Sequence, residues 1–200
     1  MHREGNVEHF RNPLGSCFNC LFARLFLCRP TPSDQNVRPL RALTNTFMKH
    51  YHCETLILAP ASAVYDAITT PPGLRGWWTA TCEVGTGVGA RSTFRFGQTH
   101  NVMEVESLRP HLEVRWRCLE QHHHAPNQLT RTDEWAGTSL IFRLIPESAS
   151  STLLKFEHLG LTPQLECYDI CNRGWNHFLA TNLKSYAETG KGTPYVEPTT

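Results

Sequence analysis

The sequence predicts an α+β domain in which a curved antiparallel sheet of about seven strands wraps one long C-terminal helix. Two patterns indicate this fold. Residues 79–158 contain short segments that alternate apolar and polar side chains, as half-exposed antiparallel strands do. Residues 162–190 keep apolar side chains at three- and four-residue spacing, which is typical of a helix with one broad apolar face. Such a face needs a sheet to cover it.

The elements follow one another in a definite order. A β-favouring run, residues 52–59, precedes a short helix that begins after Pro60 and ends at the turn around Pro71. A second short helical segment brings Trp77 and Trp78 directly after that turn. The last helix is expected to begin at Thr162-Pro163 and to run for about 25 residues. The main strands are expected at 91–96, 101–106, 112–117, 139–145 and 152–158.

Composition and charge limit the possible functions and indicate the domain boundaries. The 200 residues hold 19 Lys and Arg against 18 Asp and Glu, so the chain lacks the basic excess of a nucleic-acid binder. Residues 1–50 hold seven basic and three acidic residues, which sets this segment apart. We expect a weakly structured or disordered extension at 1–47, one domain at 48–195 and a tail at 196–200.

The first segment carries an apolar run, residues 17–28. Arg24 interrupts it and no small-residue cleavage site follows, so we expect neither a secretion signal nor a membrane span, and a cytoplasmic protein. A zinc site from Cys17, Cys20, Cys28 and His9 would be possible in principle, but a single CxxC is a weak signal. We expect the cysteines of the domain to be buried reduced thiols.

Several stretches together resemble a known family. Ala59–Thr70 followed by Leu74–Trp78, and Trp175–Tyr186 followed by Glu188–Pro194, resemble the START-like (SRPBCC) superfamily, in its branch named after the activator of heat-shock protein 90 ATPase homologue. The resemblance covers about three quarters of the chain and implies a helix-grip (START-like) fold. Members of the superfamily include lipid carriers, cyclases, hydroxylase subunits and chaperone regulators, so the fold alone leaves the function open.

The resemblance implies a cavity between the sheet and the C-terminal helix. Our leading hypothesis is a non-catalytic protein that binds or carries an apolar small molecule there, because aromatic walls bury and orient such ligands. The candidate ligand-binding residues are Trp77, Trp78, Phe94, Phe96, Trp116, Phe142, Trp175, Phe178, Leu179 and Leu183. Two alternatives stay open: a chaperone-regulating interaction module that uses the outer face of the sheet, and a cyclase or hydrolase-like enzyme.

Candidate catalytic and metal-binding residues are few. Glu104, Glu106, Glu113 and His158 lie on expected strands and could form an acid/base pair, but the alternation does not fix which face carries them. Catalytic residues therefore stay unknown, and we expect a binding protein rather than an enzyme. The run His122–His124 near His111 belongs to a polar segment, 121–131, interpreted as a solvated hairpin loop. Because consecutive residues project in different directions, we expect no metal, and no cofactor motif is present.

The boundary near Lys49 generates the first prediction. A chain that begins at Met48 should keep the melting temperature of the full chain, because the domain buries its own core. Differential scanning calorimetry of the two chains measures this. A melting temperature lower by more than a few degrees would show that the apolar run 17–28 packs on the domain.

Overall fold

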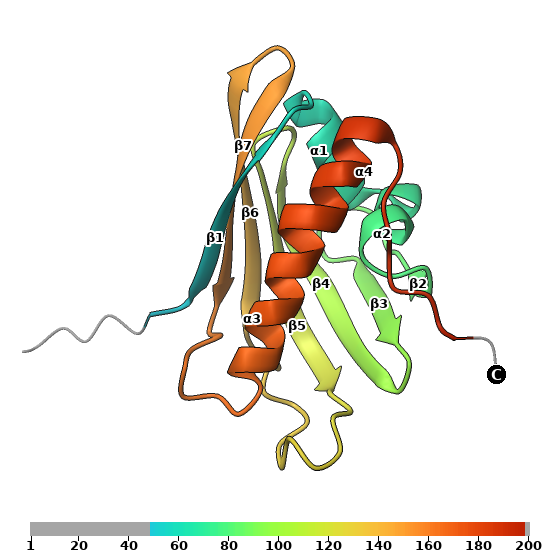
Figure 1. Cartoon of the computed structure of the whole chain (residues 1–200), viewed down its shortest axis with the longest axis vertical. Coiled ribbons are helices and arrows are strands. Elements are labelled where there is room, and N and C mark those ends of the chain that lie inside the picture. Colours follow the sequence, from blue (N-terminus) through green and yellow to red (C-terminus); the bar gives the residue numbers. More distant parts are fainter. Residues whose placement is uncertain (1–48, 199–200) are drawn as a thin grey trace, which may run out of the picture. The chain divides into compact units, whose positions relative to one another are not determined.

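An antiparallel sheet curves around one long helix (Figure 1). The structure, a computed structural model, describes residues 49–198. The sheet has seven strands in the order β1-β7-β6-β5-β4-β3-β2, so the first strand lies beside the last. The predicted α+β helix-grip fold is confirmed. The strands are β1 (Tyr51–Ile57), β2 (Cys82–Glu83), β3 (Arg91–Phe96), β4 (Thr99–Arg109), β5 (Glu113–His122), β6 (Ser139–Ser148) and β7 (Ser151–Leu159).

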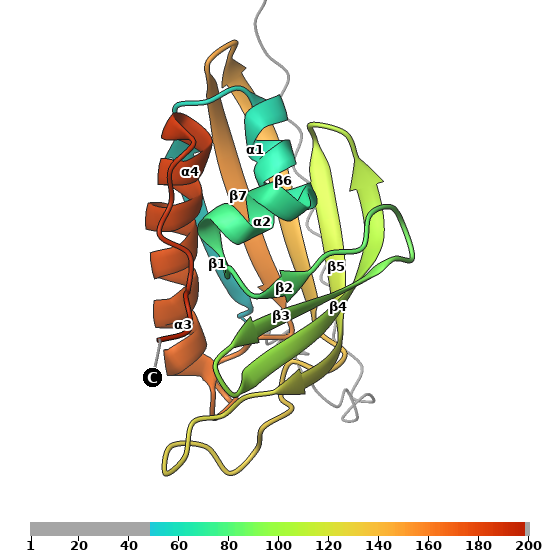
Figure 2. The ribbon, with the colours of Figure 1, turned by 90° about the vertical axis from the view of Figure 1, so that its right-hand side faces the viewer.

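Two short helices, α1 (Ala61–Thr69) and α2 (Pro71–Trp77), follow β1 and cover part of the concave face beside the long helix (Figure 2). α1 buries Val64, Ala67 and Ile68, which are the positions that its helical spacing puts on one face. The hydroxyl of Thr70 accepts the Gly73 N–H and so caps α2. α2 ends by burying Trp77, whose indole N–H donates to the Ala67 carbonyl at 2.9 Å.

The long helix lies across the sheet from Tyr168 to Thr189 (Figure 1). It comprises α3 (Tyr168–His177), a π-helical turn η1 (Phe178–Leu183) and α4 (Lys184–Thr189), and it ends at Gly190 in the left-handed region, with φ 75°. The expected start at Thr162-Pro163 was wrong. The Glu134 carboxylate accepts the N–H groups of Glu166 and Cys167, at 3.1 and 2.8 Å, so this segment is held in turns and the helix begins after it.

After the helix, the chain returns along α2. Tyr195 forms an isolated parallel bridge with Thr79. Its N–H donates to the Trp78 carbonyl and its carbonyl accepts the Ala80 N–H, both at 2.9 Å. Gly192 passes so close to α2 that an added Cβ would lie 2.3 Å from the Gly76 carbonyl oxygen. The segment up to Tyr195 is therefore part of the packed body.

A buried histidine joins β7 to the helix. His158 is fully buried, and its Nδ1 accepts the Trp175 indole N–H at 3.1 Å. Its Nε2 therefore carries the proton and donates to the Thr138 hydroxyl at 2.9 Å, which in turn donates to the Trp135 carbonyl at 2.6 Å. Every polar atom of the imidazole is paired in its neutral form. Burial, with a smaller contribution from His50, lowers the pKa of His158 to about 3.

This depressed pKa generates a prediction about stability. Below a pH of about 6.5 the unfolded chain binds a proton that the folded His158 does not take up. The free energy of unfolding should therefore fall as the pH falls from about 6.5 towards 3, by up to about 1.4 kcal/mol per pH unit from this residue. Urea denaturation at pH 7.5 and pH 5 measures the change.

The matched variant is His158→Gln, which keeps an amide donor and acceptor but does not titrate. It should be less stable than the parent at pH 7.5, and the difference between the two proteins should narrow at pH 5. An equal pH dependence in both proteins would contradict the assignment of the buried neutral histidine.

Candidate functional site

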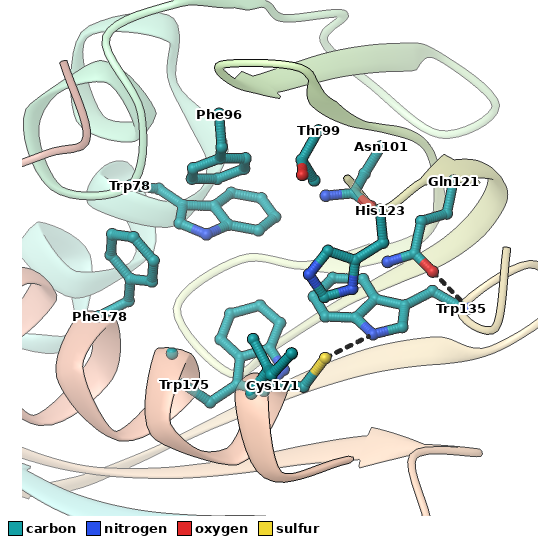
Figure 3. Close-up of a pocket in the computed structure, with 12 residues that line it drawn as sticks. Trp78, Phe96, Thr99, Asn101, Gln121, His123, Trp135, Cys171, Trp175 and Phe178 are labelled. Atoms are coloured by element: carbon teal, nitrogen blue, oxygen red, sulfur yellow. Dashed lines mark hydrogen bonds between the residues drawn. The ribbon is translucent and has the colours of Figure 1, made fainter. Parts of the chain in front are cut away.

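A pocket of about 170 Å³ opens to solvent between α3, the ends of β3–β5 and the loop that follows β5 (Figure 3). Its volume resembles the roughly 150 Å³ cavity known to accept benzene and is smaller than the roughly 300–1,000 Å³ of drug-sized sites. The pocket therefore suits one ring-sized group. Its lining consists of Trp78, Phe96, Thr99, Asn101, Gln121, His123, Trp135, Ile170, Cys171, Gly174, Trp175 and Phe178.

Aromatic rings form the apolar walls. The indole of Trp175 stacks on that of Trp135 at a centroid distance of 5.5 Å and an interplanar angle of 13°. On its other side Trp175 stacks on Trp78, also at 5.5 Å. Phe96 and Phe178 also line the pocket beside Trp78, with their ring centroids 5.8 Å apart (Figure 3). Successive indoles thus make a rigid wall from the loop to α2, suited to a flat apolar ligand.

Polar groups lie on the opposite side, on β4, β5 and the loop. Asn101 is only 3% exposed, and its carboxamide Oδ1 has no hydrogen-bond partner among residues 49–198. Gln121 is occupied, because its Oε1 accepts the Trp135 backbone N–H at 2.9 Å. An unpaired buried oxygen costs about 1–3 kcal/mol, so Asn101 is the position where a ligand donor or a water molecule would be stabilised.

Gly174 leaves the helix side of the pocket open. A Cβ built at this position has no heavy atom within 4 Å. Glycine in a helix interior costs about 0.5–1 kcal/mol relative to alanine, and here no neighbour requires it sterically. The missing side chain contributes to the space between the walls.

The structure separates the ten ligand-binding candidates into two groups. Trp78, Phe96, Trp175 and Phe178 line the pocket. The others are buried in the core at 0–4% exposure: Trp77, Phe94, Trp116, Phe142, Leu179 and Leu183. Asn101, His123, Trp135 and Gly174 also line the pocket and were not among the predicted ligand-binding residues. Trp135 offered the one usable signal, an indole within a long polar stretch.

The candidate acids lie on the outer face of the sheet. On β4, Asn101, Met103 and Val105 point inward, so the intervening Glu104 and Glu106 point outward. Glu104 pairs with Arg91 at 3.7 Å, Glu106 with Arg115 and Arg117, and Glu113 with Arg143 at 3.2 Å. His158, the fourth candidate, belongs to the core. Among the described residues no carboxylate lines the pocket.

The three histidines of the run His122–His124 lie in different environments. His122 and His124 are exposed, and His122 ends β5 by stacking on His100 of β4 at 5.7 Å. His123 is half-buried, lines the pocket and lies near Cys171 (Figure 3). The interpretation of 121–131 as a solvated loop was therefore wrong for two residues. Gln121 lies on β5, and His123 begins the loop after β5; both line the pocket.

The thiols beside His123 are reduced. All five described cysteines are free, and Cys82, Cys118, Cys167 and Cys171 are buried while Cys53 is half-buried. A hydrogen bond with the Cys171 thiol, together with burial, raises the pKa of Cys167. Burial raises the pKa of Cys118 to about 12. The prediction of buried reduced thiols is confirmed for four of these five; Cys17, Cys20 and Cys28, like the extension 1–47, lie outside the described residues.

Comparisons with known proteins agree with this architecture. The family model described as "Activator of Hsp90 ATPase homolog 1-like protein" matches residues 58–188. No protein with a curated description matches the chain. Among the described residues, no helix is both long enough and apolar enough to cross a bilayer.

Solved structures give the same result. The Aha1 dimer from Colwellia psychrerythraea is 31% identical, with a TM-score of 0.59, over 72% of this chain and 100% of that one. A Mesorhizobium loti protein is 21% identical, with a TM-score of 0.53, over 65% of this chain and 90% of that one, and it shows the fold alone. The family model and the first of these structures lead to one conclusion: the chain belongs to the family of Activator of Hsp90 ATPase homolog 1-like proteins.

Proposed function

We propose that the protein binds a small apolar molecule, with one ring in the pocket beside Trp175 and a hydrogen-bond donor directed at Asn101. The observation that carries this proposal is the combination of an aromatic wall with a buried, unpaired carboxamide oxygen. The stacked indoles offer flat apolar surface, and the oxygen offers one directional contact that would fix the ligand's orientation. A phenol-like or indole-like group has both properties.

The chemistry of the lining favours binding over turnover. A general acid or base must lie within hydrogen-bond reach of the substrate. Of the described lining residues only His123 and Cys171 could serve. His123 lacks the carboxylate partner that usually orients a catalytic histidine, and the Cys171 sulfur already accepts the Trp135 indole N–H. Carriage or sequestration of the ligand is therefore preferred to a cyclase or hydrolase-like reaction.

A chaperone-regulating role is the alternative, and the family relationship favours it. Such a role would use an outer surface and would not need the pocket. The outer face of the sheet carries paired arginine and glutamate side chains on β3–β6, which would suit a polar protein interface. Only ligand binding in the pocket requires the open space beside Gly174; an interaction through the outer face does not.

The pocket proposal predicts the effect of filling the space with a side chain. In Gly174→Phe the new ring should occupy the pocket and weaken binding of 2-naphthol, a small fluorescent aromatic alcohol, at least about tenfold. Gly174→Ala should bind nearly as the parent does and be more stable by up to about 1 kcal/mol. Fluorescence titration measures the affinities. Ala180→Phe, which adds the same ring at an exposed position of the helix, is the control.

The role of Asn101 predicts a selectivity. The parent should bind 2-naphthol about tenfold more tightly than 2-methoxynaphthalene, which lacks the donor, because one such hydrogen bond contributes about 1–1.5 kcal/mol. Asn101→Leu should bind both compounds alike. If the parent binds 2-naphthol and 2-methoxynaphthalene with equal affinity, Asn101 does not contact the ligand. If Gly174→Phe binds 2-naphthol as tightly as the parent does, 2-naphthol binds elsewhere and the pocket proposal is refuted.

The same variants separate the two functions. If the protein stimulates an Hsp90 ATPase and Gly174→Phe stimulates it as the parent does, the interaction role is independent of the pocket. Trp175→Phe is less useful for this purpose. Removing its indole N–H leaves His158 without a donor and should cost about 1–3 kcal/mol of stability, which mixes folding with binding.

A further inference from the structure

Three potential metal ligands meet at the loop end of the pocket. One atom each from His123, Cys167 and Cys171 lies within 4.8 Å of the other two. Cys167 and Cys171 stand one helical turn apart at the start of α3, where the Cys171 N–H donates to the Cys167 carbonyl at 2.9 Å. This turn puts both sulfur atoms on one side of the helix. His123 reaches them from the loop after β5.

We propose that His123, Cys167 and Cys171 bind one Zn²⁺ ion, with the fourth coordination position accessible from the pocket. Zinc binds thiolate sulfur at about 2.3 Å and imidazole nitrogen at about 2.0 Å, which in a tetrahedral site separates the donor atoms by about 3.5–3.8 Å. Donors already within 4.8 Å can reach these separations by small side-chain rotations. Two sulfurs and one imidazole favour zinc over magnesium or calcium, which prefer oxygen ligands.

An unpaired nitrogen points to a ligand at this place. The Nδ1 atom of His123 is buried and has no hydrogen-bond partner among residues 49–198, whereas the imidazole of His158 has both nitrogens paired. A cation would satisfy an imidazole nitrogen that the protein leaves without a partner. His123 also differs from its exposed neighbours His122 and His124 in turning inward.

The surrounding residues already hold the donors in place. The Trp135 indole N–H donates to the Cys171 sulfur at 3.2 Å, a contact that would stabilise a thiolate ligand (Figure 3). The Glu134 carboxylate accepts the Cys167 backbone N–H at 2.8 Å. The backbone N–H of His123 donates to the Thr132 carbonyl at 2.7 Å. Glu166 accepts the N–H groups of Thr130 and Arg131 and so ties the loop to the start of the helix.

Zinc binding would release protons from the two cysteine thiols. The two thiols would each lose one proton to solvent and bind as thiolates, and His123 would bind through an unprotonated imidazole nitrogen. The position differs from the sequence-based expectation of no metal at the histidine run. The expectation treated the run as a unit, whereas the site uses one histidine and takes its thiols from α3.

The experiment uses the full chain in a reducing buffer, so that Cys167 and Cys171 stay thiols. Elemental analysis after dialysis should find about one equivalent of zinc, and competition with a chromophoric chelator gives the affinity. Cys167→Ser, Cys171→Ser and His123→Gln should each weaken zinc binding at least about tenfold. Trp135→Phe, which removes the N–H to sulfur and part of the ring that stacks on Trp175, should weaken it by about tenfold. Cobalt in place of zinc should give thiolate-to-cobalt charge-transfer absorption that falls in each cysteine variant.

Two controls address other sources of binding. Cys17→Ser/Cys20→Ser/Cys28→Ser removes the thiols of the N-terminal segment and should keep the full equivalent. Cys118→Ser and His124→Gln change a buried thiol and an exposed imidazole that do not belong to the cluster, and these variants should also keep it. Melting temperatures in excess chelator check that every variant folds, and His123→Gln tests the site if a cysteine variant does not. Absence of zinc binding by the reduced parent, loss of zinc in the N-terminal triple variant, or unchanged affinity in His123→Gln would overturn the proposal.

Discussion

The hydrogen bond from the Trp175 indole to His158 is the contact on which the helix–sheet arrangement depends. An indole N–H and an imidazole buried under a helix are tolerable only when every donor meets an acceptor. Here the requirement is met along one path, from Trp175 through His158 and Thr138 to the Trp135 carbonyl. This path fixes the helix over β7 and simultaneously positions two of the indoles that line the pocket. The same residues therefore stabilise the fold and determine the geometry of the pocket.

Aromatic packing also determines where the pocket can be. Trp78 contacts five other rings, on α2, β3, β5 and the long helix, and it fills the middle of the concave face. The pocket beside Trp175 lies at the end of the sheet where a loop, rather than a strand, follows β5. There Gly174 supplies no side chain and Asn101 supplies a polar one. The pocket is thus a local gap at the edge of a filled core.

Alternating and helical periodicity predicted most of the fold, because the core-facing side of each strand and helix must be apolar over its whole length. Phe94, Met103 and Trp116 illustrate the pattern, and all are buried. The start of the long helix and the pocket were not predictable in this way. Both depend on the irregular loop after β5, whose path is set by long-range contacts such as Glu134 with Cys167. Periodicity carries no information about such contacts, so Trp135 and His123 were not recognised as lining residues.

The strand order has a consequence for synthesis on the ribosome. Among the seven described strands β1 is made first and its partner β7 last, and the backbone of Trp78 can pair with Tyr195 only after the long helix has been made. At elongation rates of roughly 5–20 residues per second, the nascent sheet would expose its aromatic concave face for seconds before the helix emerges. The nascent domain therefore has to be kept from aggregating during that interval.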